Sequence, residues 1–388
     1  SANAADGTLG TVSVQKGNNV SVNGEAPLSL TLDGKDHKSC QFLSKRAPDE
    51  SHEFTWKEVT TTRGGELAEI LGDQLRSVDS LVVKGNVNDK DFHAMWDASL
   101  YGYLSVINLK NAVLENNAVP DTAFFHENEQ YEGSSHEIFY YIGLRKIILP
   151  EGLEKIGEGA FYQASALRQV NFPSTLRYIG DFAFNATKLE MNQLVIPEGV
   201  EEINQYAFAF CRKLKAQVTL PSTIKKIGEW AFYGCPITSI NLPEGLESLG
   251  SLAFWDCDLR EVSIPSSCHE FNEGWQFGFN RNLEKMHLPE GMTEIPDHFA
   301  VDCFRLREVN FPHTLKHIGE KAFSLCISLK NVDLPLGMQS LGEEAFSELE
   351  ALEQIVFPAS MKSLGKNSCS YWKNIKRIYC AAMEPPVC

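Results

Sequence analysis

The chain has 388 residues, of which 43% are hydrophobic, with a formal net charge of −16 at pH 7 and a pI near 5.1. This hydrophobic content supports a large core and excludes an intrinsically disordered protein. The acidity and the lack of a Lys/Arg stripe argue against a nucleic-acid partner. No run of 18 apolar residues occurs, so no membrane span is expected.

Residues 1–62 are expected to be a short β-rich segment. The stretches TVSV (11–14), VSV (20–22) and LSLTL (28–32) alternate in polarity and are separated by turn-forming residues. This pattern is typical of short antiparallel strands. So few large apolar groups predict a small appendage of unknown role.

Residues 63–143 are expected to form an N-terminal cap and a degenerate first repeat. Asn88 should cap a helix that runs to Ala98, with Asp91 at its third position, and a shorter helix is predicted over 65–75. Leu104, Ile107 and Leu109 resemble the strand of the clearer repeats that follow. A polar cap of this kind protects the open end of a repeat array from water.

Residues 144–388 repeat one unit. LRQVNFPSTLRYIGDFAF (167–184) recurs as LREVNFPHTLKHIGEKAF (306–323), and prolines that follow an apolar residue recur every 22 to 24 positions. These are Pro150, Pro173, Pro197, Pro221, Pro243, Pro265, Pro289, Pro312, Pro335 and Pro358. A fixed period of about 23 predicts a solenoid, in which stacked units bury apolar columns that no unit can bury alone.

The alternation of Val309 and Phe311 indicates a strand, and parallel strands joined by crossovers predict a right-handed coil. We therefore expect a β-dominated α/β solenoid of about 11 turns of ~23 residues, with parallel strands and short turns or 3-10 segments on the convex side. The position after the isoleucine of each unit is mostly Gly, with Asn204, Asn272 and Pro296 as exceptions. This composition predicts a left-handed backbone there.

Five of the ten cysteines share one column three residues after the Ala-Phe pair: Cys211, Cys235, Cys257, Cys303 and Cys326. Buried, reduced thiols are expected at these positions, although stacked disulfides between adjacent turns remain an alternative. No C-x-x-C pair occurs, so no metal site and no cofactor is predicted. Cys380 and Cys388 are the best disulfide candidates, because both lie where the core thins out.

The repeats LPEGLEKIGEGAF, FPSTLRYIGDFAF and LPEGLESLGSLAF resemble those of BspA-like leucine-rich repeat proteins. The resemblance is strong over 144–388 and weaker over 63–143. It implies a bacterial protein that is secreted or surface-exposed, often as a lipoprotein whose signal and anchor would precede Ser1. It also implies binding to host extracellular proteins or other cells, and it supplies no catalytic residues.

If a binding face exists, it should be the polar side of the strands, where side chains alternate away from the core. The candidate ligand-binding residues there are Glu261, Lys285, His287, Glu308 and Asn310. The irregular stretch 255–303 adds Trp255 and Trp275, because local departures from a consensus often mark function. A plain solvated strand face, and sequence drift within the array, are the structural alternatives.

No catalytic signature is found, and an enzyme is not expected. The favoured function is a binding scaffold for a protein or peptide partner. The alternative is a carbohydrate-binding surface component, with stacking platforms at Tyr162, Tyr233, Trp255 and Trp275.

Overall fold

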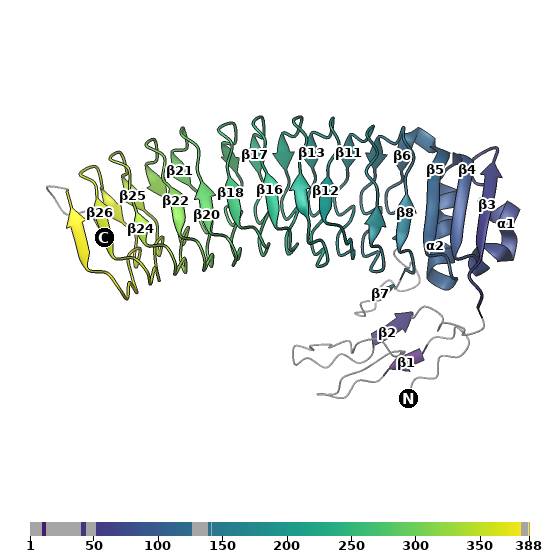
Figure 1. The fold of residues 1–388 in the computed structure, drawn as a ribbon, viewed down its shortest axis with the longest axis horizontal. Helices are drawn as coiled ribbons and strands as arrows, with labels where there is room; N and C mark the ends of the chain where they lie inside the picture. The colour runs from purple at the N-terminus through teal and green to yellow at the C-terminus, as the bar shows by residue number, and fades with distance from the viewer. Residues whose placement is uncertain are drawn as a thin grey trace.

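The computed structural model of the protein describes residues 10–12, 40–43, 52–125, 139–140, 142–381 and 387. These residues build an elongated coil whose turns stack along one axis, with two helices at its N-terminal end (Figure 1). The predicted solenoid is confirmed. It has about 13 turns where 11 were expected.

One parallel strand per turn forms the first ladder of the coil, and the longest strands belong to its first three turns. The strands of these three turns pair in parallel with one another and with β8, the first strand after residue 144. The segment upstream of residue 144 therefore adds turns to the coil. The strands are β3 (Trp56–Thr61), β4 (Ser80–Val87), β5 (Val106–Leu114), β8 (Lys146–Ile148), β10 (Gln169–Val170), β12 (Gln193–Val195), β14 (Gln217–Thr219), β16 (Ser239–Asn241), β18 (Glu261–Ser263), β20 (Lys285–His287), β22 (Glu308–Asn310), β24 (Asn331–Val332), β26 (Gln354–Phe357) and β28 (Arg377–Cys380).

A second parallel ladder, which the sequence pattern did not predict, runs along the coil at the Leu-x-x-Ile positions. Each of its strands is only two residues long, too short to show an alternation in the sequence. They are β6 (Ala118–Val119), β9 (Lys155–Ile156), β11 (Tyr178–Ile179), β13 (Glu202–Ile203), β15 (Lys226–Ile227), β17 (Ser248–Leu249), β19 (Glu270–Phe271), β21 (Glu294–Ile295), β23 (His317–Ile318), β25 (Ser340–Leu341) and β27 (Ser363–Leu364).

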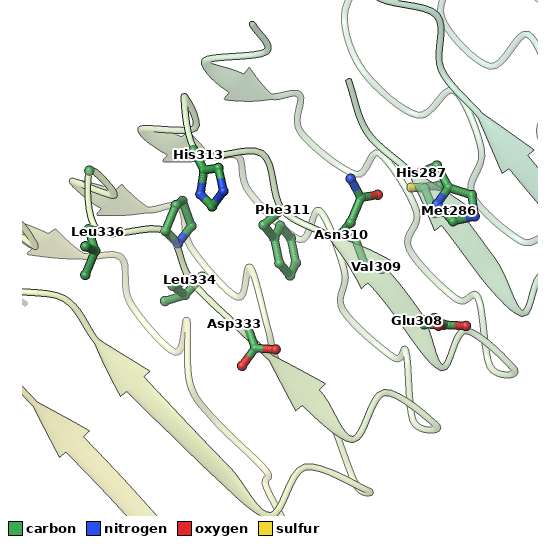
Figure 2. Close-up of a pocket in the computed structure, with 12 residues that line it drawn as sticks. Met286, His287, Glu308, Val309, Asn310, Phe311, His313, Asp333, Leu334 and Leu336 are labelled. Atoms are coloured by element: carbon green, nitrogen blue, oxygen red, sulfur yellow. The ribbon is translucent and has the colours of Figure 1, made fainter. Parts of the chain in front are cut away.

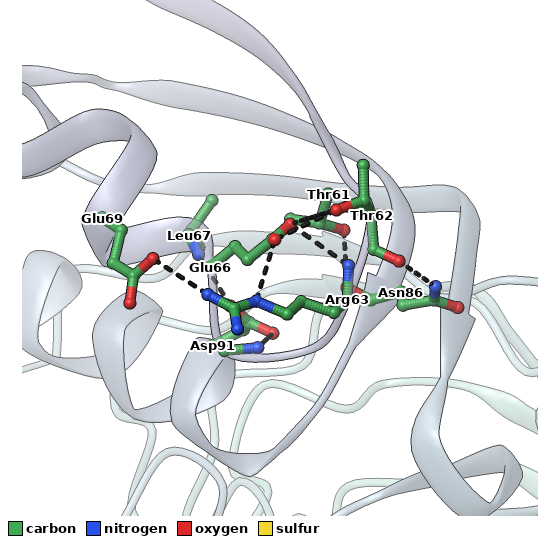
Figure 3. Close-up of polar contacts among 9 residues, drawn as sticks. Thr61, Thr62, Arg63, Glu66, Leu67, Glu69, Asn86 and Asp91 are labelled. Atoms are coloured by element: carbon green, nitrogen blue, oxygen red, sulfur yellow. Dashed lines mark hydrogen bonds and ion pairs between the residues drawn. The ribbon is translucent and has the colours of Figure 1, made fainter.

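The N-terminal end carries α1 (Leu67–Leu71), the 3-10 turn η1 (Gly72–Ser77) and α2 (Asp89–Tyr101). The predicted cap of α2 is confirmed, because the Asn88 and Asp91 side chains form a reciprocal capping box. Asp91 is fully buried and also accepts the backbone N–H groups of Gly65 and Leu67, at 2.6 and 3.0 Å. Figure 3 shows this junction, in which Glu66 accepts from Thr62 and Arg63 beside the start of α1. A second 3-10 turn, η2 (Glu115–Asn117), links β5 to β6.

A separate three-stranded sheet is formed by β1 (Gly10–Val12), β2 (Cys40–Leu43) and β7 (Phe139–Tyr140). The strand expected at 11–14 is observed in part as β1, which pairs antiparallel with β2. The strands expected at 20–22 and 28–32 lie outside the described residues.

A column of stacked phenylalanines fills the core. Rings from Phe124 to Phe277, one per turn, lie 5.2 to 5.6 Å apart and within 12° of parallel. The stack breaks at Phe299, which meets Phe277 edge-on at 76°. This break falls in the turn with Pro296, where the repeat departs from its consensus.

The predicted left-handed glycine column is wrong. None of its seven glycines has a left-handed φ. Each is needed because the preceding turn lies against it: a Cβ on Gly342 would come within 2.5 Å of the Glu320 nitrogen and 2.6 Å of the Gly319 carbonyl carbon. The exception Asn204 instead uses its side chain, which donates to the Ile179 carbonyl of the preceding turn.

Left-handed backbone occurs two and six residues after this column, at non-glycine residues such as Lys321 (φ 50°) and Leu325 (φ 62°). No helix or 3-10 segment forms in the described repeats from residue 142 onward. The segment after Gly319 is a pair of tight turns, whose N–H groups at Lys321, Phe323 and Leu325 donate to the next turn of the coil.

The cysteine column is buried and reduced, as expected. Each thiol donates to a backbone carbonyl of the preceding turn, for example Cys235 Sγ to Phe208 O at 2.9 Å. Burial raises the pKa of the Cys303 thiol to about 12. Cys380 is exposed, but Cys388 lies outside the described residues, so their pairing stays a prediction.

Within the described ranges, no helix has the length and apolar character needed to cross a membrane.

We expect Gly342→Ala to lower the free energy of unfolding by about 1–3 kcal/mol, because the new methyl group meets backbone atoms that cannot move independently. Gly337→Ala is the matched control, since its Cβ would meet only the His313 carbonyl oxygen at 3.8 Å. Urea unfolding followed by circular dichroism measures both. Equal stability of the two variants would contradict the close-approach account.

We expect the five column cysteines to resist alkylation in the native protein at neutral pH, because all five are buried and burial raises the pKa of Cys235, Cys257, Cys303 and Cys326. Iodoacetamide labelling followed by peptide mass mapping tests this. The same protein in guanidinium is the control, in which all five should react. Rapid native labelling of Cys235 or Cys303 would show that the turns open.

Candidate functional site

The polar strand face brings five of the seven predicted ligand-binding residues together. Glu261, Lys285 and Glu308 occupy matching positions on β18, β20 and β22. Lys285 Nζ lies 3.0 Å from Glu308 Oε2, a contact that raises the pKa of Lys285. His287 Nε2 lies 3.2 Å from Glu261 Oε1. All four side chains are exposed, so they can meet a partner without rearrangement of the core.

Asn310 is the fifth of these residues, and its amide is already engaged. Its Oδ1 accepts from the Leu288 N–H at 2.8 Å, and its Nδ2 donates to the Leu288 carbonyl at 2.9 Å. The side chain thus pairs with the preceding turn as another strand residue would. This pairing extends the contact between β20 and β22.

Phe311 follows directly and separates β22 from the next strand. Its half-buried ring lies edge-on to Phe323 of its own turn, at 5.6 Å, and to Phe346 of the next turn, at 6.2 Å. The first ladder is interrupted here, since β22 and β24 belong to different sheets. The ring thus lies wedged between the two turns; the ladder is also interrupted between β16 and β18, where Leu242 stands at this position.

An open groove of about 780 Å³ lies at this interruption. We call it the Asn310 groove; besides Asn310, its lining includes His287, Glu308, Phe311, His313, Leu334 and Leu336. Figure 2 shows these side chains, with Asp333, arranged around one hollow on successive turns. The lining thus combines apolar side chains with carboxylates and imidazoles.

Two residues of the groove lining, His313 and Leu336, depart from a sequence pattern that alternates between successive repeats. The turn after the proline reads Glu-Gly in one repeat and Ser-Thr or Ser-Ser in the next, and the serine N–H and hydroxyl donate to the glutamate, as Ser174 does to Glu151. At the groove His313 replaces the serine and Leu336 replaces the glutamate. Leu336 is 88% exposed, the highest value among the large apolar residues that the structure describes.

Trp255 and Trp275 lie away from the strand face, in the turns that follow the second ladder. Both are half-buried. Their rings are 5.2 Å apart, Trp255 also contacts Phe279 at 4.4 Å, and Trp275 stacks on His298 at 3.6 Å. Burial lowers the pKa of His298. The structure therefore divides the predicted residues between two places.

Sequence reasoning assigned no site role to Phe311, Leu334 or Leu336. A signal for Leu336 was present, because leucine between proline and glycine stands where four other repeats have glutamate. The wedge role of Phe311 had no such signal, since Phe also fits a buried strand position.

Comparison with known proteins gives a family and a fold. The family described as "BspA type Leucine rich repeat region (6 copies)" matches residues 134–217, 215–323 and 298–383, which together exceed half of the chain. No curated protein matches the chain.

The chain is similar to a solved leucine-rich repeat protein from Bacteroides ovatus, with 22% identity over 78% of this chain and 79% of that chain and a TM-score of 0.55. A leucine-rich cell surface protein from Faecalibacterium prausnitzii is 17% identical over 93% of this chain and 96% of its own, with a TM-score of 0.40. The pneumococcal vaccine antigen PcpA is 16% identical over 97% and 88%, also with a TM-score of 0.40.

The first of these similarities supports the same fold as the described coil. Together with the repeat and the extent of the family match, it leads to one conclusion: this chain belongs to the BspA-type leucine-rich repeat family.

Proposed function

We propose that the protein is a non-enzymatic binding scaffold that recognises a protein partner on its polar strand face, centred on the Asn310 groove. The observation that carries this proposal is the exposed Leu336 beside the half-buried Phe311 and Leu334. An exposed leucine at a position that is otherwise acidic costs solubility and contributes nothing to the core. A contact with a partner gives it a role.

The groove also favours a particular partner chemistry. An apolar side chain that enters it would gain roughly 1.5–3 kcal/mol from burial against Phe311 and Leu334. Glu308 is already paired with Lys285 and Glu261 lies beside His287, so the exposed carboxylate of Asp333 sets the charge that a partner would meet at the groove. We therefore expect the partner to carry a Lys or Arg close to its apolar anchor.

Membership of the BspA-type family supports a secreted or surface-exposed location and an extracellular partner, including host proteins. A lipid anchor upstream of Ser1 is part of the same proposal. Sequencing the coding region before Ser1 tests it, because a signal peptide that ends at a lipidated cysteine would be visible there.

Carbohydrate binding by the aromatic residues stays an alternative prediction. The rings named for it pack on neighbouring rings: Tyr162 meets Phe125 and Phe182, and Tyr233 meets Trp230 and Phe210. Stacking on a sugar needs an open ring face. Binding on a glycan array that is lost in Trp255→Ala would favour this alternative.

We expect Leu336→Glu to weaken binding to any extracellular partner roughly ten-fold or more, because it removes apolar contact and adds a charge at the groove. The probes are purified extracellular-matrix proteins in surface plasmon resonance. Leu336 is too exposed for the change to disturb the core, and an unchanged melting temperature should verify this.

The matched control is Val113→Glu, which makes the same chemical change at a residue that is 60% exposed on β5, far along the coil. It should bind as the unmodified chain does. If both variants lose the same affinity, or neither does, the groove is not the binding site.

A further inference from the structure

The pair of side chains found at the Asn310 groove, an asparagine followed by a phenylalanine, occurs a second time at Asn171 and Phe172. Asn171 accepts the Leu149 N–H at 2.7 Å and donates to the Leu149 carbonyl at 3.0 Å, as Asn310 does with Leu288. Phe172 then lies 5.5 Å from Phe184 of its own turn and 6.2 Å from Phe208 of the next. The first ladder is again interrupted, here between β10 and β12.

A second groove of about 660 Å³ lies at this interruption. We call it the Asn171 groove; its lining includes Lys110, Lys146, Ile148, Asn171, Glu190 and Met191. Ile148 and Met191 supply its apolar surface. Its carboxylates are already engaged, since Glu190 pairs with Arg168 at 2.9 Å and Glu151 accepts from Ser174. Lys110 and Lys146 therefore set the charge that a partner would meet.

The two grooves lie on one strand face, six strand intervals apart, from β10 to β22. With successive parallel strands about 4.8 Å apart, the separation is roughly 29 Å. An extended polypeptide advances about 3.3 Å per residue, so roughly nine residues span that distance.

The surface between the grooves is suited to a polypeptide backbone. Its outward positions on β12, β14, β16 and β18 up to Ser263 carry amides and hydroxyls, with Val195 as the one apolar member and Glu261 as the first charge. These positions are Gln193, Val195, Gln217, Thr219, Ser239, Asn241 and Ser263. Amide and hydroxyl groups can donate to and accept from peptide groups, and no aromatic ring is present there to stack on a sugar.

We propose that the strand face holds one extended polypeptide segment along the axis of the coil, with an apolar side chain in each groove about nine residues apart. The segment carries a cationic residue beside the Asn310 groove and an acidic residue beside the Asn171 groove. This inference rests on the proposed binding function and specifies the form of the partner. Two linked anchors raise the affinity because the second one binds intramolecularly.

Selection of random 15-residue peptides by phage display on the immobilised full chain tests the proposal. The expected consensus has two apolar residues eight to ten positions apart, flanked by opposite charges. A synthetic peptide of that consensus is then titrated against the unmodified chain, Leu336→Glu, Ile148→Asn and a control, Ile70→Glu, which changes a half-exposed residue on α1 at the N-terminal end of the coil. Asn occupies the position of Ile148 in other repeats, so this change is compatible with the fold.

We expect each groove variant to weaken binding of the peptide about ten-fold or more, and Ile70→Glu to leave the affinity unchanged. Moving one apolar residue three positions along the peptide should lower its affinity for the unmodified chain as much as a groove substitution does. Peptides that depend on Leu336 and ignore Ile148→Asn would overturn the two-groove inference and leave the proposed function intact. Failure to enrich any peptide, or peptides that ignore both groove variants, would overturn both.

Discussion

Every feature of this coil depends on how closely consecutive turns approach one another. Backbone groups on several sides of each turn bond to the turns above and below, through the two ladders and through the tight turns at Lys321 and Phe323. This spacing leaves no room for a Cβ at Gly342 and its equivalents. It also places the phenylalanine rings of neighbouring turns at a contact distance for stacking, and it lets the column of thiols reach the carbonyls of the preceding turn.

The grooves arise where this spacing is relaxed on one side. At each groove a phenylalanine ring touches two turns, and the preceding asparagine forms hydrogen bonds to the backbone of the turn before. A surface made mostly of solvated polar side chains thereby carries two grooves that are lined in part by apolar groups.

The parts of the fold that follow from packing periodicity could be predicted from the sequence. The 23-residue period, the outward position of Glu308 and the capping box at Asn88 and Asp91 all depend on local patterns. The second ladder could not be predicted, because a two-residue strand such as β23 leaves no alternation. The glycine column was predicted to have a left-handed backbone, whereas it is explained by the close approach of the preceding turn. The sequence does not distinguish these two causes, because both favour glycine. Of the candidate site, the polar positions were predictable, but the wedge at Phe311 depends on a contact with Phe346 of the next turn.

The alternation of Glu-Gly and Ser-Thr turns has a consequence for how such a chain can change in length. Glu151 is matched to Ser174 and Glu198 to Ser222, so each hydrogen-bonded link joins two unlike neighbours. Removing a single turn would place two like corners side by side, two glutamates or two serines, with no complementary group between them. Removing a matched pair leaves every remaining link intact. The unit whose duplication or deletion keeps these hydrogen-bonded links matched is therefore a pair of turns.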